Sequence, residues 1–100
     1  MSAARDKLPP IHPGEILRDE MEALGLSARK LATALAVPPN RLTAVLAGRR
    51  AITAVTALRL SRYFGTSARF WLNLQQRYDL RRAEIEAGPT IAASVRPRAA

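Results

Sequence analysis

The sequence predicts a small all-α domain of five helices, the last of them long. Apolar residues recur at helical spacing in five segments, glycine or proline separates those segments, and no stretch alternates like a half-buried strand. A chain of 100 residues can bury one core but not a second. We therefore expect a flexible arm over residues 1–10, one helical domain over residues 11–87 and a tail over residues 88–100.

The first helix is expected to begin in the run Ile11-His12-Pro13 and to end at Gly25. Proline suits a first helical turn, and the carboxylate of Glu15 favours the positive end of the helix dipole. The spacing predicts a buried stripe of Ile16, Leu17, Met21 and Leu24. The other face is acidic and carries Asp19, Glu20 and Glu22. We expect this acidic face to be solvated rather than catalytic, and to point away from DNA.

Two short helices joined by a stiff turn are predicted between residues 26 and 50. Ser27 is placed to cap the first helix, and Gly48 follows the second as a left-handed C-cap would. The run Ala36-Val37-Pro38-Pro39 cannot continue a helix, although Pro39 itself suits the first turn of the next one. Each helix has one apolar face, formed first by Leu31, Ala32 and Leu35 and then by Leu42, Val45 and Leu46. This is the pattern of a helix-turn-helix motif.

A fourth helix is predicted over residues 54–64, capped by Thr53 and ended by Gly65. Its core residues are expected to be Ala57, Leu60, Ser61 and Phe64. The fifth helix follows the cap residue Ser67 and is expected to run to Ala87, where Gly88-Pro89 stops it. Its apolar stripe consists of Phe70, Trp71, Leu74 and Tyr78.

The fifth helix raises the question of what covers its apolar stripe. A helix of about 20 residues is longer than four short helices can cover, so part of the stripe needs another partner. A second copy of the chain is the simplest candidate. We therefore predict a homodimer whose interface includes Trp71, Leu74 and Tyr78, the alternative being that these are ordinary core residues.

The charge is distributed unevenly along the chain. The net charge is +8, and all eight acids lie outside residues 23–78, whereas nine Arg and Lys residues lie inside that span. A positive field centred on the helix-turn-helix favours phosphate as the partner, and a merely solvated basic face is the less favoured alternative.

Several classes of function are disfavoured by composition. His12 is the only histidine and cysteine is absent, so carboxylates alone would have to complete a transition-metal site around it. We expect His12 instead to cap a helix or make a surface hydrogen bond. No nucleophile and base share a suitable spacing, so no enzyme activity and no cofactor are predicted. The opening MSAARDKLPP is unlike a signal peptide and no apolar run approaches a membrane span, so a cytoplasmic protein without membrane contact is expected.

Three segments of the sequence, in the order in which they follow one another, resemble those of a known family: HPGEILRDEM, NRLTAVLAGRRAIT and ALRLSRYFGTSARFWLNLQQRYDL. Over roughly residues 11 to 80 the chain resembles the HigA-type antitoxins, the VapI-like branch of the Xre (phage-repressor-like) helix-turn-helix family. The resemblance implies a homodimer that represses its own operon by binding double-stranded DNA at a palindromic operator. It also implies binding to a RelE-like (HigB-type) mRNA-cleaving toxin, which neutralises that toxin.

The resemblance assigns DNA contacts by position. Ser27 and Lys30 match the part of the first motif helix that meets phosphate, and Arg49 and Arg50 match the basic elbow after the second. The outward face of the recognition helix corresponds to Asn40, Arg41, Thr43 and Ala44. These side chains suit base edges in the major groove, since asparagine pairs with adenine, arginine with guanine, and a methyl group with the thymine methyl. Ordinary helix-start chemistry is an equally good reading of Asn40 and of Thr43.

Two residues depart from the common pattern of the family. Ala36 stands where glycine is usual in the turn, and a left-handed conformation there costs roughly 1–2 kcal/mol for a residue with a Cβ atom. Pro38 stands where a capping serine or threonine is common. These departures bear on the geometry of the turn and on the stability of the recognition helix.

Three hypotheses for the function remain open on the sequence. The first is the operator-binding antitoxin, the second a helix-turn-helix repressor without a toxin, and the third an interaction protein whose basic face binds an acidic protein or RNA. A toxin, if present, is expected to contact the acidic first helix or the N-terminal arm, because RNA-cleaving toxins are commonly basic.

Overall fold

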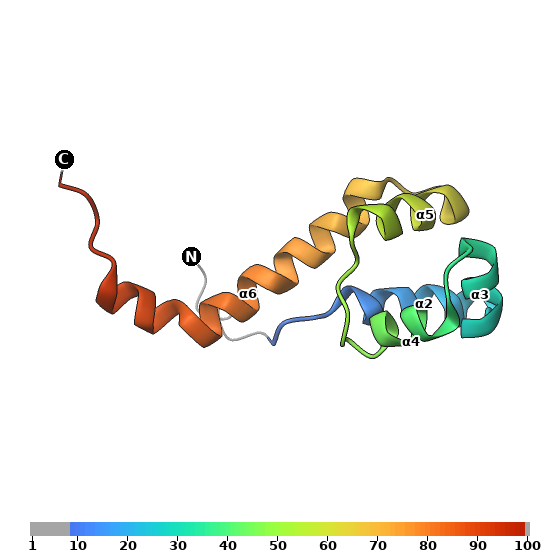
Figure 1. Cartoon of the computed structure of the whole chain (residues 1–100), viewed down its shortest axis with the longest axis horizontal. Coiled ribbons are helices and arrows are strands. Elements are labelled where there is room, and N and C mark those ends of the chain that lie inside the picture. Colours follow the sequence, from blue (N-terminus) through green and yellow to red (C-terminus); the bar gives the residue numbers. More distant parts are fainter. Residues whose placement is uncertain (1–8, 100) are drawn as a thin grey trace.

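The computed structural model describes residues 9–99, and these residues form five α-helices and no strand, as the sequence predicted (Figure 1). The helices are α2 (Pro13–Leu24), α3 (Ala28–Leu35), α4 (Pro39–Leu46), α5 (Ala54–Phe64) and α6 (Ala68–Ser94). In Figure 1, α2 to α5 gather at one end of the molecule, and α6 extends from them to the C-terminal end. The predicted arm over residues 1–10 lies almost entirely outside the described residues.

The start of α2 is closed by a reciprocal pair of hydrogen bonds. The backbone N–H of Gly14 donates to Nδ1 of His12 at 2.9 Å, and the backbone N–H of His12 donates to the carboxylate of Glu15 at 3.1 Å. Two of the amides that a helix start leaves without partners are thereby satisfied. The prediction that His12 caps a helix is confirmed.

The end of α2 departs from the predicted stripe at one residue. Gly25 takes a left-handed conformation with φ 65°, and the N–H of Leu26 donates to the carbonyl of Met21 at 2.8 Å. Leu26 packs against the core, while Leu24 is 58% exposed. The prediction that Leu24 is buried was wrong because the C-terminal cap turns the chain, and the residue after the glycine makes the apolar contact.

The turn between α3 and α4 takes the strained form that the sequence indicated. Ala36 has φ 56° and ψ 45°, and the N–H groups of Ala36 and Val37 donate to the carbonyls of Thr33 and Ala32. Pro38 is extended and caps α4 with no side-chain hydrogen bond. Ala36 is the one residue other than glycine with positive φ among residues 9–99.

Ala36→Gly is therefore expected to raise the free energy of unfolding by about 1 kcal/mol. Glycine removes the backbone strain of roughly 1–2 kcal/mol that a residue with a Cβ atom has in the left-handed conformation. Part of this stabilisation is lost because glycine also increases the conformational entropy of the unfolded chain. Urea denaturation of the purified protein measures the difference. Gly65→Ala is the matched control, because Gly65 has φ 77° and a Cβ atom there would meet nothing within 4 Å, and it should have the opposite sign. An Ala36→Gly protein no more stable than the parent would contradict the strain.

One apolar core joins all five helices. α6 packs on α5 and α2, α4 packs on α2 and α3, and α3 also meets α5. The predicted inner faces of α3 and α4 are buried as expected. The largest fully buried side chains are Trp71, Leu17, Leu31, Ile52, Leu60 and Pro13.

The predicted stripe of α6 is only partly buried. Trp71 is 1% exposed and its indole N–H donates to Oγ1 of Thr66 at 2.9 Å, whereas Phe70 is 42% exposed and was wrongly assigned to the stripe. Leu74 and Tyr78 are half-buried. A polar residue that the sequence did not single out, Gln75, is buried on the same helix.

α6 also continues beyond its predicted end. The sequence predicted a stop at Gly88-Pro89, but the helix runs through Pro89 to Ser94. Proline within a helix removes one hydrogen bond and bends the axis without always ending it. Figure 1 shows a change of direction of α6 in its C-terminal part, and the molecule measures 53 Å along its longest axis.

Candidate nucleic-acid interface

α4 has two faces with different residues and different environments. Leu42, Val45 and Leu46 are buried, whereas Asn40 and Thr43 on the opposite side are exposed. Ala47, which continues the exposed side by one turn, is exposed as well, and the sequence had not singled it out. A helix that presents a polar face while its other face holds the core is suited to enter a groove of a partner.

Asn40 and Thr43 differ in the hydrogen bonds that their side chains make. The hydroxyl of Thr43 donates to the backbone carbonyl of Asn40 at 3.1 Å, which is ordinary chemistry within a first helical turn. The amide side chain of Asn40 makes no hydrogen bond within the described part of the chain, although it lies in the first turn of α4. Asn40 therefore keeps its full hydrogen-bonding capacity for a partner, and Thr43 offers mainly its methyl group.

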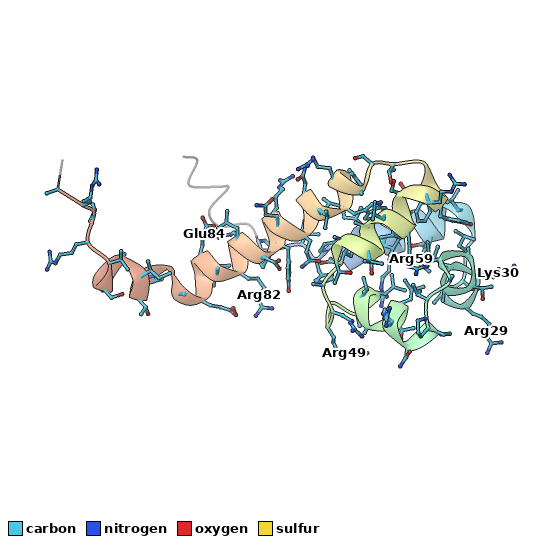
Figure 2. All side chains as sticks on the ribbon, turned by 45° about the horizontal axis from the view of Figure 1, so that its top comes forward. Arg29, Lys30, Arg49, Arg59, Arg82 and Glu84 are labelled. Carbon is cyan, nitrogen blue, oxygen red and sulfur yellow. The ribbon has the colours of Figure 1, made fainter. Side chains whose placement is uncertain are left out.

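The cations flank the exposed face of α4 on two sides. Figure 2 shows Arg29 and Lys30 projecting outward from α3, and Arg49 projecting outward on the other side of α4. Ser27 caps α3 by accepting from the N–H of Lys30 at 3.2 Å. Ser27 is itself exposed and lies beside these charges. Ala44 is only half exposed and lies at the edge of the face.

The basic elbow, residues Arg49 to Ile52, follows a defined helix end. Gly48 has φ 77°, its N–H donates to the carbonyl of Val45, and the N–H of Arg49 donates to Ala44 at 2.9 Å. This bonding pattern reverses the chain in a fixed direction. The side chains of Arg49 and Arg50 are exposed and form no ion pair or hydrogen bond with any part of residues 9–99.

Behind the elbow, several arginines lie beside the N-terminus of α5, which the sequence did not predict. A hollow of about 200 Å³ lies between α4, the elbow and the start of α5. Three arginines line it, Arg41, Arg50 and Arg59, together with Thr53 and Thr56 at the start of α5. Cations beside a helix N-terminus make a favourable environment for an anion.

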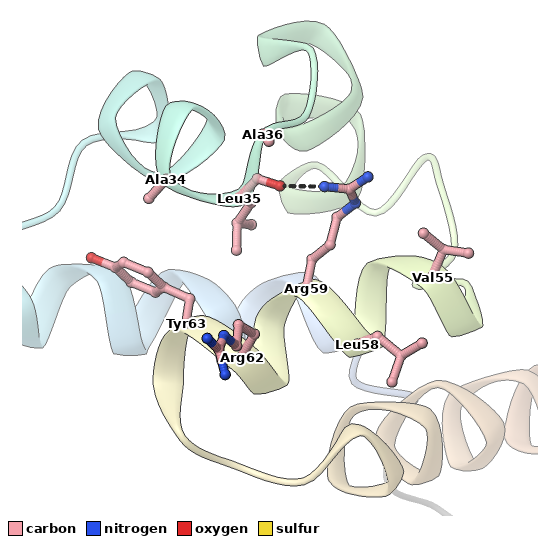
Figure 3. Close-up of a pocket in the computed structure, with 8 residues that line it drawn as sticks. All are labelled: Ala34, Leu35, Ala36, Val55, Leu58, Arg59, Arg62 and Tyr63. Carbon is pink, nitrogen blue, oxygen red and sulfur yellow. Dashed lines mark hydrogen bonds between the residues drawn. The ribbon is translucent and has the colours of Figure 1, made fainter.

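Arg59 has a structural contact as well. Its guanidinium donates to the carbonyl of Leu35 at 3.0 Å, which satisfies one of the free carbonyls at the end of α3 (Figure 3). Arg18 similarly donates to the carbonyl of Leu46 at the end of α4. Not every cation of this basic chain is therefore free for a partner.

Burial and the ring's neighbours set the protonation of His12, which lies against the elbow. Burial lowers the pKa of His12 below its ordinary value of about 6.5, opposed by the backbone of Arg50 and by the charges of Asp79 and Glu15. His12 is 6% exposed, and its ring meets that of Tyr78 edge to face with centroids 4.8 Å apart. The ring is accordingly neutral at pH 7.

The residues predicted for a dimer interface differ in the surface they leave free. Trp71 is enclosed by its own chain and has no surface for direct contact with a second copy. Leu74 packs against the core and Tyr78 against His12, each keeping part of its surface exposed. Beyond them, Leu80 and Ile85 continue along α6 as exposed apolar residues. The interface stays a prediction.

A second apolar surface lies on α5. A shallow hollow of about 620 Å³ between α3 and α5 is lined by Val55, Leu58 and Tyr63 with Arg59 and Arg62 (Figure 3). Val55 and Leu58 are about as exposed as Leu80 and Ile85 on α6.

Residues 9–99 contain neither a metal-binding cluster nor a membrane-spanning helix. No group of three acidic, histidine or cysteine side chains is arranged to hold a metal ion within this range. None of the helices described has the combination of length and apolar character needed to cross a membrane.

Comparison with known proteins identifies the family. The sequence pattern of the Helix-turn-helix family matches residues 17–71. Virulence-associated protein I of Dichelobacter nodosus is 54% identical over 83 residues, which is 82% of this chain and 77% of that protein. An addiction module antidote protein of the HigA family from Coxiella burnetii is 52% identical with a TM-score of 0.89, covering 91% of this chain and all of that one.

A third relative was solved with DNA. The antitoxin HigA of Pseudomonas aeruginosa, in a structure with the higBA promoter, is 44% identical with a TM-score of 0.87, covering 90% of this chain and 99% of that one. Since the family pattern spans more than half of the chain and the relatives match nearly its full length, the chain belongs to the helix-turn-helix family, within the group that contains virulence-associated protein I and the HigA antitoxins.

Proposed function

We propose that this protein is a HigA-type antitoxin that represses its own operon by binding operator DNA. The observation that carries the proposal is the exposed face of α4, whose Asn40 is unpaired within the described chain and flanked by free cations on α3 and on the elbow. A relative of the same fold solved with promoter DNA supports it. Such a role would place the protein with the chromosome, in the cytoplasm.

The contacts are proposed to divide into two chemical groups. Asn40, Thr43 and Ala44 would face base edges in the major groove, with Ala47 extending the same face, and Arg41 would reach a base edge from beside the hollow that it lines. Phosphates would be bound by Ser27, Lys30, Arg49 and Arg50, and one further phosphate by the hollow behind the elbow. Phosphate contacts set affinity for any DNA, whereas base contacts set sequence preference.

Removal of the two groups is expected to give different results in a DNA-binding titration. Arg49→Ala and Arg50→Ala should each weaken binding to operator and random DNA alike, and each should flatten the slope of log K against log salt by about one. Asn40→Ala should cost roughly 1–3 kcal/mol on operator and little on random DNA, with the slope nearly unchanged.

Arg96→Ala is the matched control for loss of charge, because Arg96 is exposed and belongs to the segment after α6, which lies at the other end of the molecule from α4 (Figure 1). It should leave both affinities nearly unchanged. Equal weakening of both kinds of DNA by Asn40→Ala, in a protein of normal stability, would remove Asn40 from base reading. Failure of the parent protein to prefer operator over random DNA would refute the repressor.

A homodimer is part of the proposal, because a palindromic operator presents two half-sites about 34–36 Å apart. We infer that the second copy docks on α6 at Leu74 and Tyr78, with Leu80 extending the contact. Sedimentation at micromolar concentration should give a dimer that Leu80→Glu disrupts. Leu58→Glu, an equally exposed leucine on α5, is the matched variant, and a dimer lost only with Leu58→Glu would move the interface to α5.

A RelE-like toxin is the other proposed partner. Asp19, Glu20 and Glu22 are all exposed on α2 and supply the acidic face for a basic toxin. Co-expression with the adjacent reading frame should recover a bound protein, and Asp19→Lys with Glu20→Lys should release it. If no neighbouring product binds while operator binding is intact, the alternative of a repressor without a toxin is favoured.

A further inference from the structure

The backbone of the basic elbow is held at two points by side chains from other helices. The N–H of Ile52 donates to Oε1 of Gln75 on α6 at 2.8 Å, and the ring of His12 lies close enough to the backbone of Arg50 for that backbone to raise the pKa of the ring. His12 and Gln75 are 6% and 7% exposed, and they are the only buried polar side chains of the described residues. Each lies against the backbone beside the cations.

The orientation of the His12 ring follows from its other contacts. Nδ1 accepts from the N–H of Gly14, so in the neutral ring Nε2 carries the proton and is the nitrogen left to interact with the backbone of Arg50. The ring is braced on the side of α6 by Tyr78. The charged groups around it are Glu15 on α2 and Asp79 on α6, and Asp79 in turn accepts from Nε2 of Gln75 at 2.9 Å. The two anchors are thus linked through Asp79, which accepts from Gln75 and whose charge acts on the ring of His12.

The other contacts of the elbow lie at its two ends, where the N–H of Arg49 donates to the carbonyl of Ala44 and the side chain of Ile52 is buried in the core. Between these ends, the side chains of Arg49, Arg50 and Ala51 are exposed and do not pack against the core. Gly48, which precedes them, has no side chain that could pack. A phosphate contact is strongest when the cation is already in place, because ordering a long side chain and its backbone on binding consumes part of the free energy. The hydrogen bond from Ile52 to Gln75 and the buried ring of His12 beside Arg50 supply that order in advance.

We propose that His12 and Gln75 are positioning residues that hold Arg49 and Arg50 in place for the DNA backbone. The inference rests on the proposed DNA binding and deepens it, since neither side chain would touch DNA. It also makes α6, which supplies Gln75 and the Tyr78 brace, part of the support of the DNA-binding surface.

The test uses His12→Asn and Gln75→Met in the full chain. Asparagine is a good N-cap and keeps an acceptor for Gly14, but its side chain is too short to reach Arg50. Methionine has nearly the length of glutamine and lacks the acceptor for Ile52. Each variant is expected to bind operator and random DNA about tenfold more weakly than the parent, with a flatter salt slope.

A double-mutant cycle distinguishes positioning from a merely structural effect. In a background with Arg49→Ala and Arg50→Ala, His12→Asn and Gln75→Met should cause almost no further loss of affinity, because they act through the removed cations. The same tenfold loss in that background would overturn the proposal, and so would parent-like binding by His12→Asn. Ser67→Ala, which removes the cap of α6 away from the elbow, is the control for reduced helix stability and should bind DNA like the parent.

The cycle also separates this inference from the proposed function. If Arg49→Ala and Arg50→Ala leave DNA affinity unchanged, the phosphate-binding elbow itself is refuted. If those variants weaken binding while His12→Asn does not, the elbow binds DNA and the positioning proposal alone is refuted.

Discussion

Gly14→Ala is expected to lower the free energy of unfolding by at least about 3 kcal/mol, at the upper end of the range for overpacking. A Cβ atom at Gly14 would lie 2.2 Å from the carbonyl oxygen of Val45 and 3.1 Å from Cα of Leu46. Both are backbone atoms, so no side-chain rotation relieves the clash. The start of α2 would have to separate from the end of α4, which would also disturb the helix end before the elbow.

Urea or guanidinium denaturation measures this effect, and the chain offers a matched control. Gly88 lies within α6, and a Cβ atom there would meet no atom within 4 Å. Gly88→Ala should therefore stabilise the protein by about 0.5–1 kcal/mol through helix propensity. A loss of less than about 1 kcal/mol in Gly14→Ala would mean that the two helices separate easily, contrary to the close contact described above.

Trp71→Ala is expected to lower the free energy of unfolding by about 3–5 kcal/mol, because it removes the largest fully buried side chain of the core. The indole packs beside Phe64, with ring centroids 6.1 Å apart, and its N–H is bonded to Thr66. The cavity would lie where α5 and α6 meet.

Phe70→Ala is the control for loss of an aromatic residue on the same helix. Phe70 is largely outside the core, so its removal should cost roughly 1 kcal/mol, within the usual range for exposed or half-exposed sites. Thermal or denaturant unfolding, followed by circular dichroism because Trp71 is the only tryptophan, compares the two variants. Equal losses in both would show that Trp71 does not form the core contact assigned to it.

The local chemistry of the helix ends could be predicted from the sequence because each cap depends on residues within three or four positions. Ser27, Thr53 and Ser67 all accept from the backbone N–H three residues later, as predicted. Gly25 and Gly65 end their helices in the left-handed conformation. Neighbouring residues alone determine these features, so one sequence is enough.

Features that depend on distant residues could not be predicted in the same way. Gln75 meets Ile52 across 23 positions, and Arg59 meets the end of α3 across 24, so neither contact has a local signal. The hollow behind the elbow has the same origin, because it combines α4 with α5. Pro89 was misjudged for another reason, since proline either ends or bends a helix and the sequence does not say which.

The division of α4 into two independent faces has a consequence for how such regulators diversify. Leu42, Val45 and Leu46 hold the helix in the core, while Asn40 and Thr43 are exposed on the opposite side. Under the proposed function, substitutions on the outer side change the recognised DNA sequence at little cost to folding. A chromosome that encodes several such proteins can therefore keep their regulatory circuits insulated through a few surface changes, and the same positions allow a designer to retarget this chain without rebuilding its interior.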